Sequence, residues 1–407
     1  MTIPLIRRLT LQNFLSYGPD GVSVDLLPLN VLIGPNASGK SNLLEALAVL
    51  RGAARDLQTA LREGGGSLEY PWKGDGREDV CFIEAVIDPV DPSWSYHPAM
   101  VDLQSIRYSL LLRLVGSRFL VGNESVGAII DDEDVGPLQE RVYELTGHVG
   151  TSFPWSQRQT RGNGGTEIKN LQLTESILTQ LRDPIQYPEL ASLSDHFGGI
   201  ALFQDWSFGR RTLVRQPQPT DLPTEFLLSD ASNLGLILHD LSQTSAKREE
   251  MISYLRKFYE QARYISTKVQ GGTIQLFIEE EGGRLVPATR LSDGTLRYLC
   301  LLAILLHPNP PPLIGIEEPE LGLHPDVVPT IAELLKKASE RTQLFVTTHS
   351  DVLVSALSDT PESILVCESM PSGTNVERLD AGRLREWLKE YSLGEIWRMG
   401  EIGGNRW

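Results

Sequence analysis

The chain has 407 residues, of which 41% are hydrophobic and 22% charged, as in folded globular proteins with enough apolar material for a sizeable core. The formal net charge of −16 opposes unspecific binding to nucleic-acid phosphates, so DNA contact would require a local basic patch. We find no apolar run of the ~18 residues that a membrane helix needs, and no signal-peptide pattern. The three cysteines are far apart and suggest neither a disulfide framework nor a zinc site. Together these features predict a cytoplasmic protein without membrane association.

The first elements predict a strand, a loop and a helix in that order. Leu, Ile and Val alternate or cluster over residues 4–14 and 22–33, which predicts two strands. A glycine-rich loop at 34–41 follows, and residues 42–63 then place apolar side chains at helical spacing. Two later β-rich runs, 79–88 and 106–115, indicate an antiparallel extension.

The middle of the chain gives weaker signals. From about residue 116 to 224 the pattern breaks into short segments, which we interpret as an insertion or lid. Residues 232–263 predict one or two amphipathic helices, and strands at 264–269 and 273–280 flank a Gly-Gly turn. Because no heptad repeat is sustained, a long coiled coil is not expected.

The last third returns to alternating strands and helices. We predict helices over 296–306 and 327–340, and buried strands over 312–318 and 343–350. The tail from residue 384 onward has apolar and aromatic residues at helical spacing. It either packs on the preceding domain or recruits a partner.

Residues 34–41, with the sequence GPNASGKS, satisfy the pattern G-x-x-x-x-G-K-[ST]. In such a loop, backbone N–H groups converge on phosphate and the following helix adds positive partial charge. The motif predicts that Lys40 reaches the β- and γ-phosphates of a nucleotide and that Ser41 ligates Mg²⁺.

Acidic side chains and a histidine end the two late buried strands. Glu317 and Glu318 are adjacent, so one can hold Mg²⁺ while the other orients or deprotonates water; a solvated strand end is the alternative. Strand alternation points their side chains in different directions. His349 ends the next strand, where an imidazole can contact a γ-phosphate or water, or can merely pack.

These motifs together resemble those of SMC-like and RecF-like ATPases. GPNASGKSNLLEAL is similar to their phosphate loop and first helix, and LSDGTLRYL, from residue 291, resembles the signature of ATP-binding-cassette proteins. IEEPELGLHP and TTHS resemble the strand of the magnesium-binding and catalytic acids and the switch-histidine strand. Standalone prokaryotic ATPases related to the OLD family and phage-defence ATPase subunits are the nearest group.

The resemblance implies a fold and a set of residue roles. The fold is α/β, a P-loop NTPase head of the ABC type with a mixed sheet, a lid and a helical subregion. Glu317 becomes the magnesium-side acid, Glu318 the catalytic glutamate and His349 the γ-phosphate switch. The ATP-binding residues that it implies are Gly34, Asn36, Ser38, Gly39, Lys40, Ser41 and Asn42, together with Ser292 and Gly294, which would contact ATP held by a second copy.

Three departures from the family pattern stand out. Asp293 and Thr295 replace the usual glycine and glutamine of the signature, and the magnesium-side acid is a glutamate rather than an aspartate. Read alone, the signature is better explained as an ordinary helix cap with Ser292 or Asp293 as the N-cap residue. The glutamine-bearing loop that links nucleotide to lid is not evident, and Gln204 is only a candidate for it.

The predicted organisation divides the chain into four parts. Residues 1–115 and 285–370 form the two halves of the ATPase head, 116–284 the insertion with its helical segment, and 371–407 the tail. OLD-family proteins carry a TOPRIM nuclease after the ATPase, but only about 35 residues follow the recognisable head here, which is too short for a domain. We therefore expect no nuclease within this chain.

The predicted function is ATP- and Mg²⁺-dependent dimerisation and hydrolysis that regulates a separately encoded partner effector in anti-phage defence. Among relatives this effector is often TOPRIM-like. The alternative is a RecF-like ATPase that binds DNA in repair. Candidate basic residues for DNA contact are Arg158, Arg161, Arg210, Arg211 and Arg215. Solvated loops are the alternative interpretation of each group.

Overall fold

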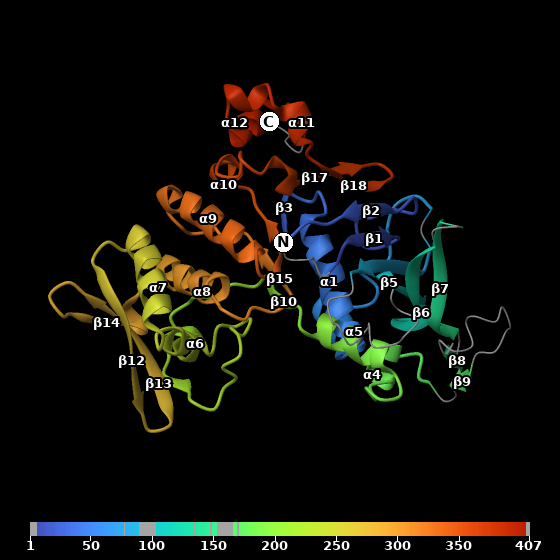
Figure 1. Ribbon diagram of the computed structural model, residues 1–407, viewed down its shortest axis with the longest axis horizontal. Helices are drawn as coiled ribbons and strands as arrows, with labels where there is room; N and C mark the ends of the chain where they lie inside the picture. Colours follow the sequence, from blue (N-terminus) through green and yellow to red (C-terminus); the bar gives the residue numbers. More distant parts are fainter. Residues whose placement is uncertain are drawn as a thin grey trace.

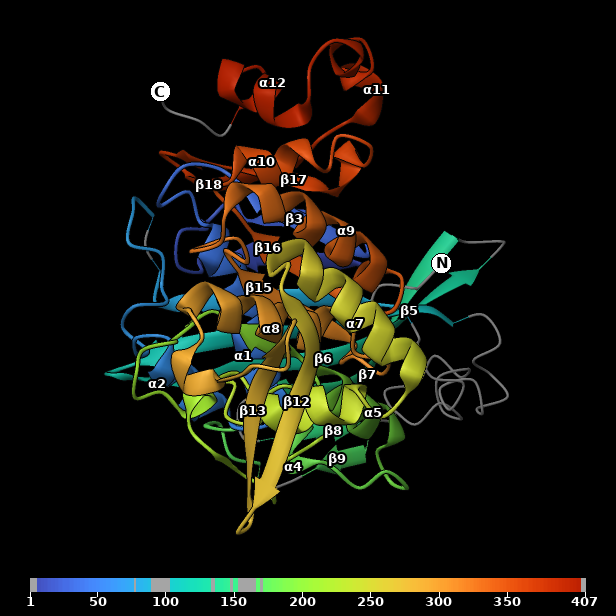
Figure 2. The same ribbon diagram turned by 90° about the vertical axis from the view of Figure 1, so that its left-hand side faces the viewer.

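The computed structural model describes residues 6–76, 78–88, 103–132, 136–146, 149–152, 166–168 and 171–403. Arg158 and Arg161 therefore lie outside the described residues. Within the described part, a central sheet with helices on both faces lies between a lobe of antiparallel strands and a lobe of helices with a projecting hairpin (Figure 1). The C-terminal helices cap the molecule at one end, at the top of both views (Figures 1 and 2).

The central sheet has six strands in the order β10-β15-β16-β3-β17-β18. All neighbours are parallel except the β17–β18 hairpin. The strands span Ala201–Phe203 (β10), Leu313–Glu317 (β15), Gln343–Thr347 (β16), Leu29–Ile33 (β3), Ile364–Met370 (β17) and Gly373–Arg378 (β18). This order places the strand before the phosphate loop beside β16, and β16 beside β15, although they are far apart in the sequence.

The central strands read as continuous apolar runs because both of their faces are buried. Along β3, Val31 and Ile33 pack into one core cluster, and Leu32 between them packs into the other. The first cluster contains side chains of α6 (Leu234–Leu241), α7 (Ser245–Phe258), α8 (Asp293–Leu305) and α9 (Val328–Ser339). The second contains side chains of α1 (Lys40–Ala54), α2 (Leu57–Glu63), α4 (Ile177–Gln180) and α5 (Pro188–Gly198).

The helix predicted over residues 42–63 is two helices. It ends at Ala54, and α2 begins after Asp56, whose side chain accepts a hydrogen bond from the Thr59 backbone N–H. An aspartate that caps a new N-terminus competes with helix continuation, so the apolar periodicity alone did not locate the break.

A second sheet of eight strands has the order β2-β1-β4-β5-β6-β7-β8-β9. Its strands are Val22–Asp25 (β2), Arg8–Gln12 (β1), Val80–Ile87 (β4), Leu103–Val115 (β5), Arg118–Asp132 (β6), Gly136–Thr146 (β7), Val149–Ser152 (β8) and Thr166–Ile168 (β9). The predicted antiparallel extension is confirmed by the pairing of β4 with β5. The expectation of short segments after residue 116 is wrong, because β6 alone has 15 residues.

The third sheet forms the projecting hairpin of Figure 2. β12 (Ala262–Gln270) and β13 (Thr273–Glu280) pair across the Gly271–Gly272 turn, as predicted, and β11 (Gln218–Pro219) and β14 (Leu285–Pro287) add to β13. Short 3₁₀ turns lie at Leu213–Arg215 (η2), Ala288–Arg290 (η3), Pro325–Val327 (η4), Pro361–Ser363 (η5) and Trp387–Lys389 (η6). The described chain contains no long coiled coil.

The C-terminal segment packs on the central domain. It comprises α11 (Ala381–Leu384), η6 and α12 (Leu393–Met399), and it lies against α10 (Asp351–Ser355). Leu393, Ile396 and Trp397 are buried in this contact. The Leu393 backbone N–H donates to the Ser358 hydroxyl at 2.8 Å. No helix among the described residues has both the length and the apolar character required to cross a membrane.

Candidate functional site

The phosphate loop connects the buried end of β3 to the first turn of α1. Gly34 has φ of +147°, and a Cβ there would lie 2.2 Å from the Cys367 carbonyl oxygen. Gly39 has φ of +94°, and its Cβ would lie 2.4 Å from the Thr374 hydroxyl oxygen. Both positions therefore require glycine, for backbone conformation and for space.

The side chain of Lys40 folds back onto the phosphate loop. Its ammonium group donates to the carbonyl oxygens of Gly34 at 2.8 Å and Pro35 at 2.9 Å. The side chain is buried, and this desolvation lowers the pKa of Lys40 from its ordinary value. The cation is thus held at the loop, where a phosphate group would be its natural counter-charge.

The other predicted loop residues differ in their surroundings. Asn36 is exposed, and Ser38 is buried with its backbone carbonyl accepting from the Thr374 hydroxyl at 3.1 Å. Asn42 donates from its side-chain amide to the Ser16 hydroxyl at 2.7 Å, and Thr374 donates to the same hydroxyl oxygen at 2.7 Å. Ser16 and Thr374 support the loop from both ends of the chain, and no local motif marked them.

Ser41 and Glu317 meet at the end of the loop. The Ser41 hydroxyl donates to the Glu317 carboxylate, although the two residues are 276 positions apart in the sequence. A hydroxyl and a carboxylate are the hard oxygen donors that Mg²⁺ prefers. These two residues therefore fit a magnesium ion bound beside the phosphate loop.

Glu318 follows directly after the end of β15. Its φ of 45° is in the left-handed region, which a side chain rarely adopts. The backbone N–H donates to the Thr347 carbonyl oxygen at 3.0 Å, which fixes the turn against β16. The Glu318 carboxylate then lies 3.6 Å from Nε2 of His349.

His349 is half-buried, and desolvation by burial lowers its pKa from the ordinary value, as does the positive charge of Lys40, whereas Glu318 raises it. The imidazole is consequently neutral at neutral pH and can either donate or accept a hydrogen bond. The predicted catalytic acid and switch histidine are brought together by the pairing of β15 with β16.

Glu320 is a third acid at this site, and the sequence analysis did not single it out. It accepts hydrogen bonds from the Thr348 hydroxyl and from the His349 backbone N–H, the latter at 3.3 Å. Burial raises its pKa. Glu320 therefore holds the backbone that carries His349, and the only signal for it was a third acid in the run EEPE.

Trp206 is another residue that sequence reasoning missed. Its indole N–H donates to the backbone carbonyl of Glu317 at 3.2 Å. The ring stacks between Phe203 and Phe208, with centroids 5.7 and 5.8 Å away, and the Arg297 guanidinium lies 5.1 Å from its centroid. The aromatic run after β10 was visible in the sequence, but the pairing of β10 with β15, which brings Trp206 beside Glu317, was not.

Gln204 follows β10, which pairs in parallel with β15. It lines a cavity of about 400 Å³ together with Glu45 and Glu317. The structure thus places the candidate glutamine and the predicted magnesium-side acid in the lining of the same cavity.

The signature residues lie apart from this cluster. The Ser292 hydroxyl caps α8 by accepting from the Thr295 backbone N–H at 3.0 Å, and a Cβ at Gly294 would lie 2.9 Å from the Gly322 carbonyl oxygen. Among the hydrogen bonds of the described residues, none joins Ser292 or Gly294 to the phosphate loop of the same chain.

Asp293, the unusual signature residue, forms an ion pair with the guanidinium of Arg215. Arg215 is buried and also donates to the carbonyl oxygens of Phe208 at 2.8 Å and Leu291 at 2.6 Å. Arg215 is therefore unavailable to DNA, and its inclusion among the candidate DNA contacts is wrong. Arg210 and Arg211 are exposed.

The fold and the constellation of phosphate loop, hydroxyl and strand-end acids define an ATPase head of the ABC and SMC-like type. Residues 29–84 and 170–355 match the protein family described as "AAA domain, putative AbiEii toxin, Type IV TA system". The chain belongs to this family. The predicted ABC- and SMC-like head fold is confirmed, whereas a closer relationship to OLD-family or phage-defence proteins stays a prediction.

Several solved structures are similar in fold. An SMC head bound to the C-terminal winged-helix domain of ScpA is 14% identical, with a TM-score of 0.57, over 93% of this chain and 99% of the other. An SMC head from Pyrococcus furiosus bound to the C-terminal domain of ScpA is 13% identical (TM-score 0.58, 95% and 99% covered). One from Pyrococcus yayanosii is 12% identical (TM-score 0.51, 95% and 99% covered). No match was found among curated proteins.

Proposed function

We propose that this chain binds ATP with Mg²⁺ at the phosphate loop and hydrolyses it, and that this cycle regulates a separately encoded effector. One observation carries the proposal: Ser41, Glu317, Glu318 and His349 converge on neighbouring strand ends beside the loop. Family membership supports nucleotide binding, and the geometry supports a division of labour among these side chains.

The binding residues act through charge and hydrogen bonding. Lys40 exchanges its bonds to loop carbonyls for the β- and γ-phosphates, and backbone N–H groups of the loop add hydrogen bonds to the same phosphates. Ser41 and Glu317 hold the Mg²⁺, which neutralises phosphate charge when bound. Gln204 lines the same cavity as Glu317, so it can change its contacts when nucleotide binds and transmit that change to the rest of the head.

The reaction residues act on the attacking water. Glu318 accepts the water's proton or orients it in line with the γ-phosphate. His349, neutral for the reasons given above, hydrogen-bonds the γ-phosphate and is kept at 3.6 Å from Glu318 by the β15–β16 pairing. The left-handed backbone at Glu318 fixes the direction of its carboxylate.

Two copies are expected to close on ATP. Ser292 and Gly294 lie at the N-terminus of α8, a 13-residue helix whose end favours anions, yet among the described residues no hydrogen bond joins them to the loop of their own chain. We infer that they contact the nucleotide of a second copy. Glu318→Gln should trap such a dimer with ATP, as a change in mass by light scattering; an unchanged monomer would contradict it.

A protein partner is favoured over DNA. The family description names a toxin–antitoxin system, and two similar SMC heads were solved with bound ScpA domains, so a regulatory partner, TOPRIM-like or otherwise, in anti-phage defence fits. The net charge of −16 and the buried position of Arg215 oppose a DNA-binding role. Filter binding with ATP at low salt checks the DNA alternative directly.

The test of the catalytic assignment is ATP turnover. Lys40→Ala should abolish nucleotide binding, whereas Glu318→Gln should retain ATP and lose about 10²–10⁴-fold in kcat, the usual contribution of a general base. Glu260→Gln, which removes an exposed carboxylate elsewhere, is the matched control. Turnover of Glu318→Gln equal to that of the control would refute the assignment.

A further inference from the structure

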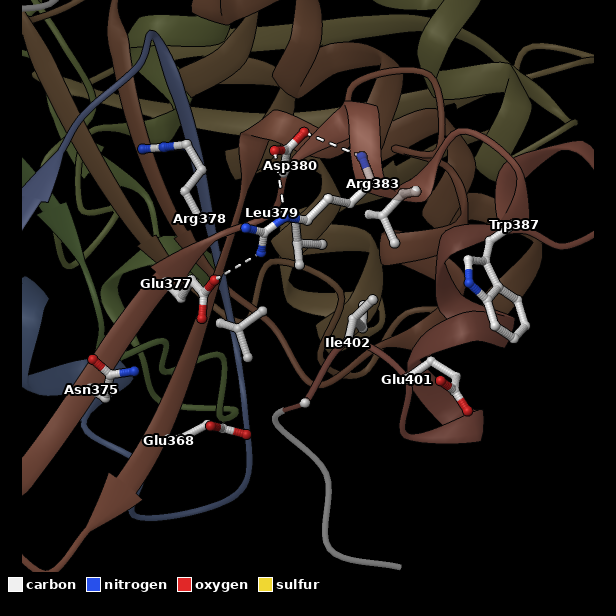
Figure 3. Close-up of a pocket in the computed structure, with 13 residues that line it drawn as sticks. Glu368, Asn375, Glu377, Arg378, Leu379, Asp380, Arg383, Trp387, Glu401 and Ile402 are labelled. Atoms are coloured by element: carbon white, nitrogen blue, oxygen red, sulfur yellow. Dashed lines mark hydrogen bonds and ion pairs between the residues drawn. The ribbon is translucent and has the colours of Figure 1, made fainter.

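A cavity of about 420 Å³ lies between the β17–β18 hairpin and the C-terminal segment (Figure 3), and none of the acids of the phosphate site lines it. Its walls come from both strands of the hairpin, from α11 and η6, and from the residues that follow α12. Val366, Leu379 and Ile402 supply an apolar floor. Because the C-terminal segment is folded onto the head, this cavity exists only in the tertiary structure.

The charge of the cavity is negative. Its carboxylates are Glu368, Glu377, Asp380 and Glu401, and its guanidinium groups are Arg378 and Arg383. Arg378 donates to the backbone carbonyl oxygens of Glu362 and Asp25, each at 2.6 Å, and to the side-chain oxygen of Asn30, all of which lie outside the cavity lining. Arg383 alone is shared between Glu377 at 4.0 Å and Asp380 at 3.8 Å, as Figure 3 shows.

One carboxylate and one aromatic ring remain for a ligand. Among the described residues, no side chain forms an ion pair with Glu401. Trp387, whose side chain is 40% exposed, lines the cavity near Glu401 (Figure 3). An indole face, a carboxylate and an apolar floor are together complementary to a guanidinium or ammonium group on an aliphatic stem.

We propose that this cavity binds an arginine or lysine side chain presented by a partner protein. This proposal rests on the proposed function at one point, namely that the partner protein is the effector that the ATPase regulates. Four carboxylates oppose the phosphates of a nucleic acid at the same place, and the apolar floor suits the methylene stem of a basic side chain.

The same two strands connect this cavity to the phosphate loop. Glu368 faces the cavity, and its neighbour Cys367 has the carbonyl oxygen that closely approaches Gly34. Asn375 faces the cavity, and its neighbour Thr374 donates to the Ser38 carbonyl. A ligand in the cavity would thus contact the direct neighbours of Cys367 and Thr374, which both lie against the loop, and we expect its binding to alter the affinity for nucleotide.

The experiment measures binding of a labelled pentapeptide, Ala-Leu-Arg-Leu-Ala, to the full chain by fluorescence anisotropy. A second peptide carries citrulline, the neutral isostere of arginine, and separates recognition of the charge from apolar contact. We expect saturable binding of the arginine peptide, and weakening of at least about fivefold for Glu401→Gln, for Trp387→Ala and for the citrulline peptide.

Glu390→Gln is the matched control, because it removes an exposed carboxylate of the same segment that does not line the cavity. Equal weakening by Glu390→Gln and Glu401→Gln, equal binding of the two peptides, or no saturable binding would overturn the proposal. Glu401→Gln keeps the test valid if Trp387→Ala does not fold, which circular dichroism reveals.

The same samples separate this proposal from the proposed function. The arginine peptide is expected to change the Kd for ATP by at least about threefold in wild type and not in Glu401→Gln. Peptide binding without any ATP turnover would refute the ATPase function and leave the cavity assigned. ATP turnover without peptide binding would refute the cavity assignment and leave the ATPase function standing. An unchanged Kd for ATP would refute the connection between the cavity and the phosphate loop.

Discussion

Glu124 belongs to β6, and its carboxyl group is fully buried against the start of α4. It accepts hydrogen bonds from the Tyr108 hydroxyl at 2.6 Å, the Ser176 hydroxyl at 2.5 Å and the Ile177 backbone N–H at 2.8 Å. Burial raises the pKa of Glu124 from 4.5 to about 7, and these hydrogen bonds only partly oppose the effect. Glu124→Gln removes the titration while retaining a side-chain carbonyl that accepts hydrogen bonds.

The pKa of this group gives both the sign and the size of the expected effect. Because the folded protein holds the Glu124 proton more tightly than the unfolded chain, its contribution to stability is complete below pH 4.5 and is lost as pH rises through about 7. At 1.36 kcal/mol per pH unit, the loss between pH 5 and pH 8 is about 2–3 kcal/mol. The variant should lack this loss.

The assay is urea unfolding of wild type and Glu124→Gln at pH 5, 6, 7 and 8. Glutamine places an NH₂ group against the Ile177 backbone N–H, which costs on the order of 1 kcal/mol at every pH, so the comparison rests on slope and not on absolute stability. We expect the free energies of unfolding to converge or cross as pH rises. Parallel curves from pH 5 to pH 8 would show that Glu124 is charged in the fold and would refute the reasoning.

Three further substitutions follow from single contacts. Gly34→Ala places a Cβ 2.2 Å from the backbone carbonyl of Cys367 at φ of +147°, so it should lose nucleotide binding, measured by calorimetry, and lower the Tm by several degrees. Trp206→Phe removes the hydrogen bond to the Glu317 carbonyl but keeps the stacked ring, so kcat should fall about three- to tenfold with little change in the Kd for ATP. Gly394→Ala puts a Cβ 2.1 Å from the Asp351 carbonyl and should release α12 from α10, seen as faster hydrogen exchange in both helices.

The sequence by itself determined the phosphate loop, because all of that motif is contiguous. The glycines, Lys40 and Ser41 follow from a strand, a turn and a helix N-terminus that eight successive residues specify. The late strands were also predictable, since burial on both faces requires an unbroken apolar run. For the same local reason, the acids and the histidine that end those runs were identified.

The tertiary structure decided which distant residues meet. Ser41 reaches Glu317 only because β3, β16 and β15 lie side by side, and Thr374 supports the loop only because β18 joins the same sheet. Arg215 was predicted to be a surface residue, but in the fold it is buried, paired with Asp293 and hydrogen-bonded to the Leu291 carbonyl oxygen.

The physical reason is the range of the interactions. Motifs and periodicity record what a residue's own element requires, whereas sheet order depends on the summed packing of segments that lie hundreds of residues apart. Trp206 and Glu320 were therefore invisible as site residues, since each acts through backbone groups of another strand. The residues of the phosphate loop follow from a contiguous motif, whereas the acids and the histidine beside it are positioned by the order of strands in the sheet.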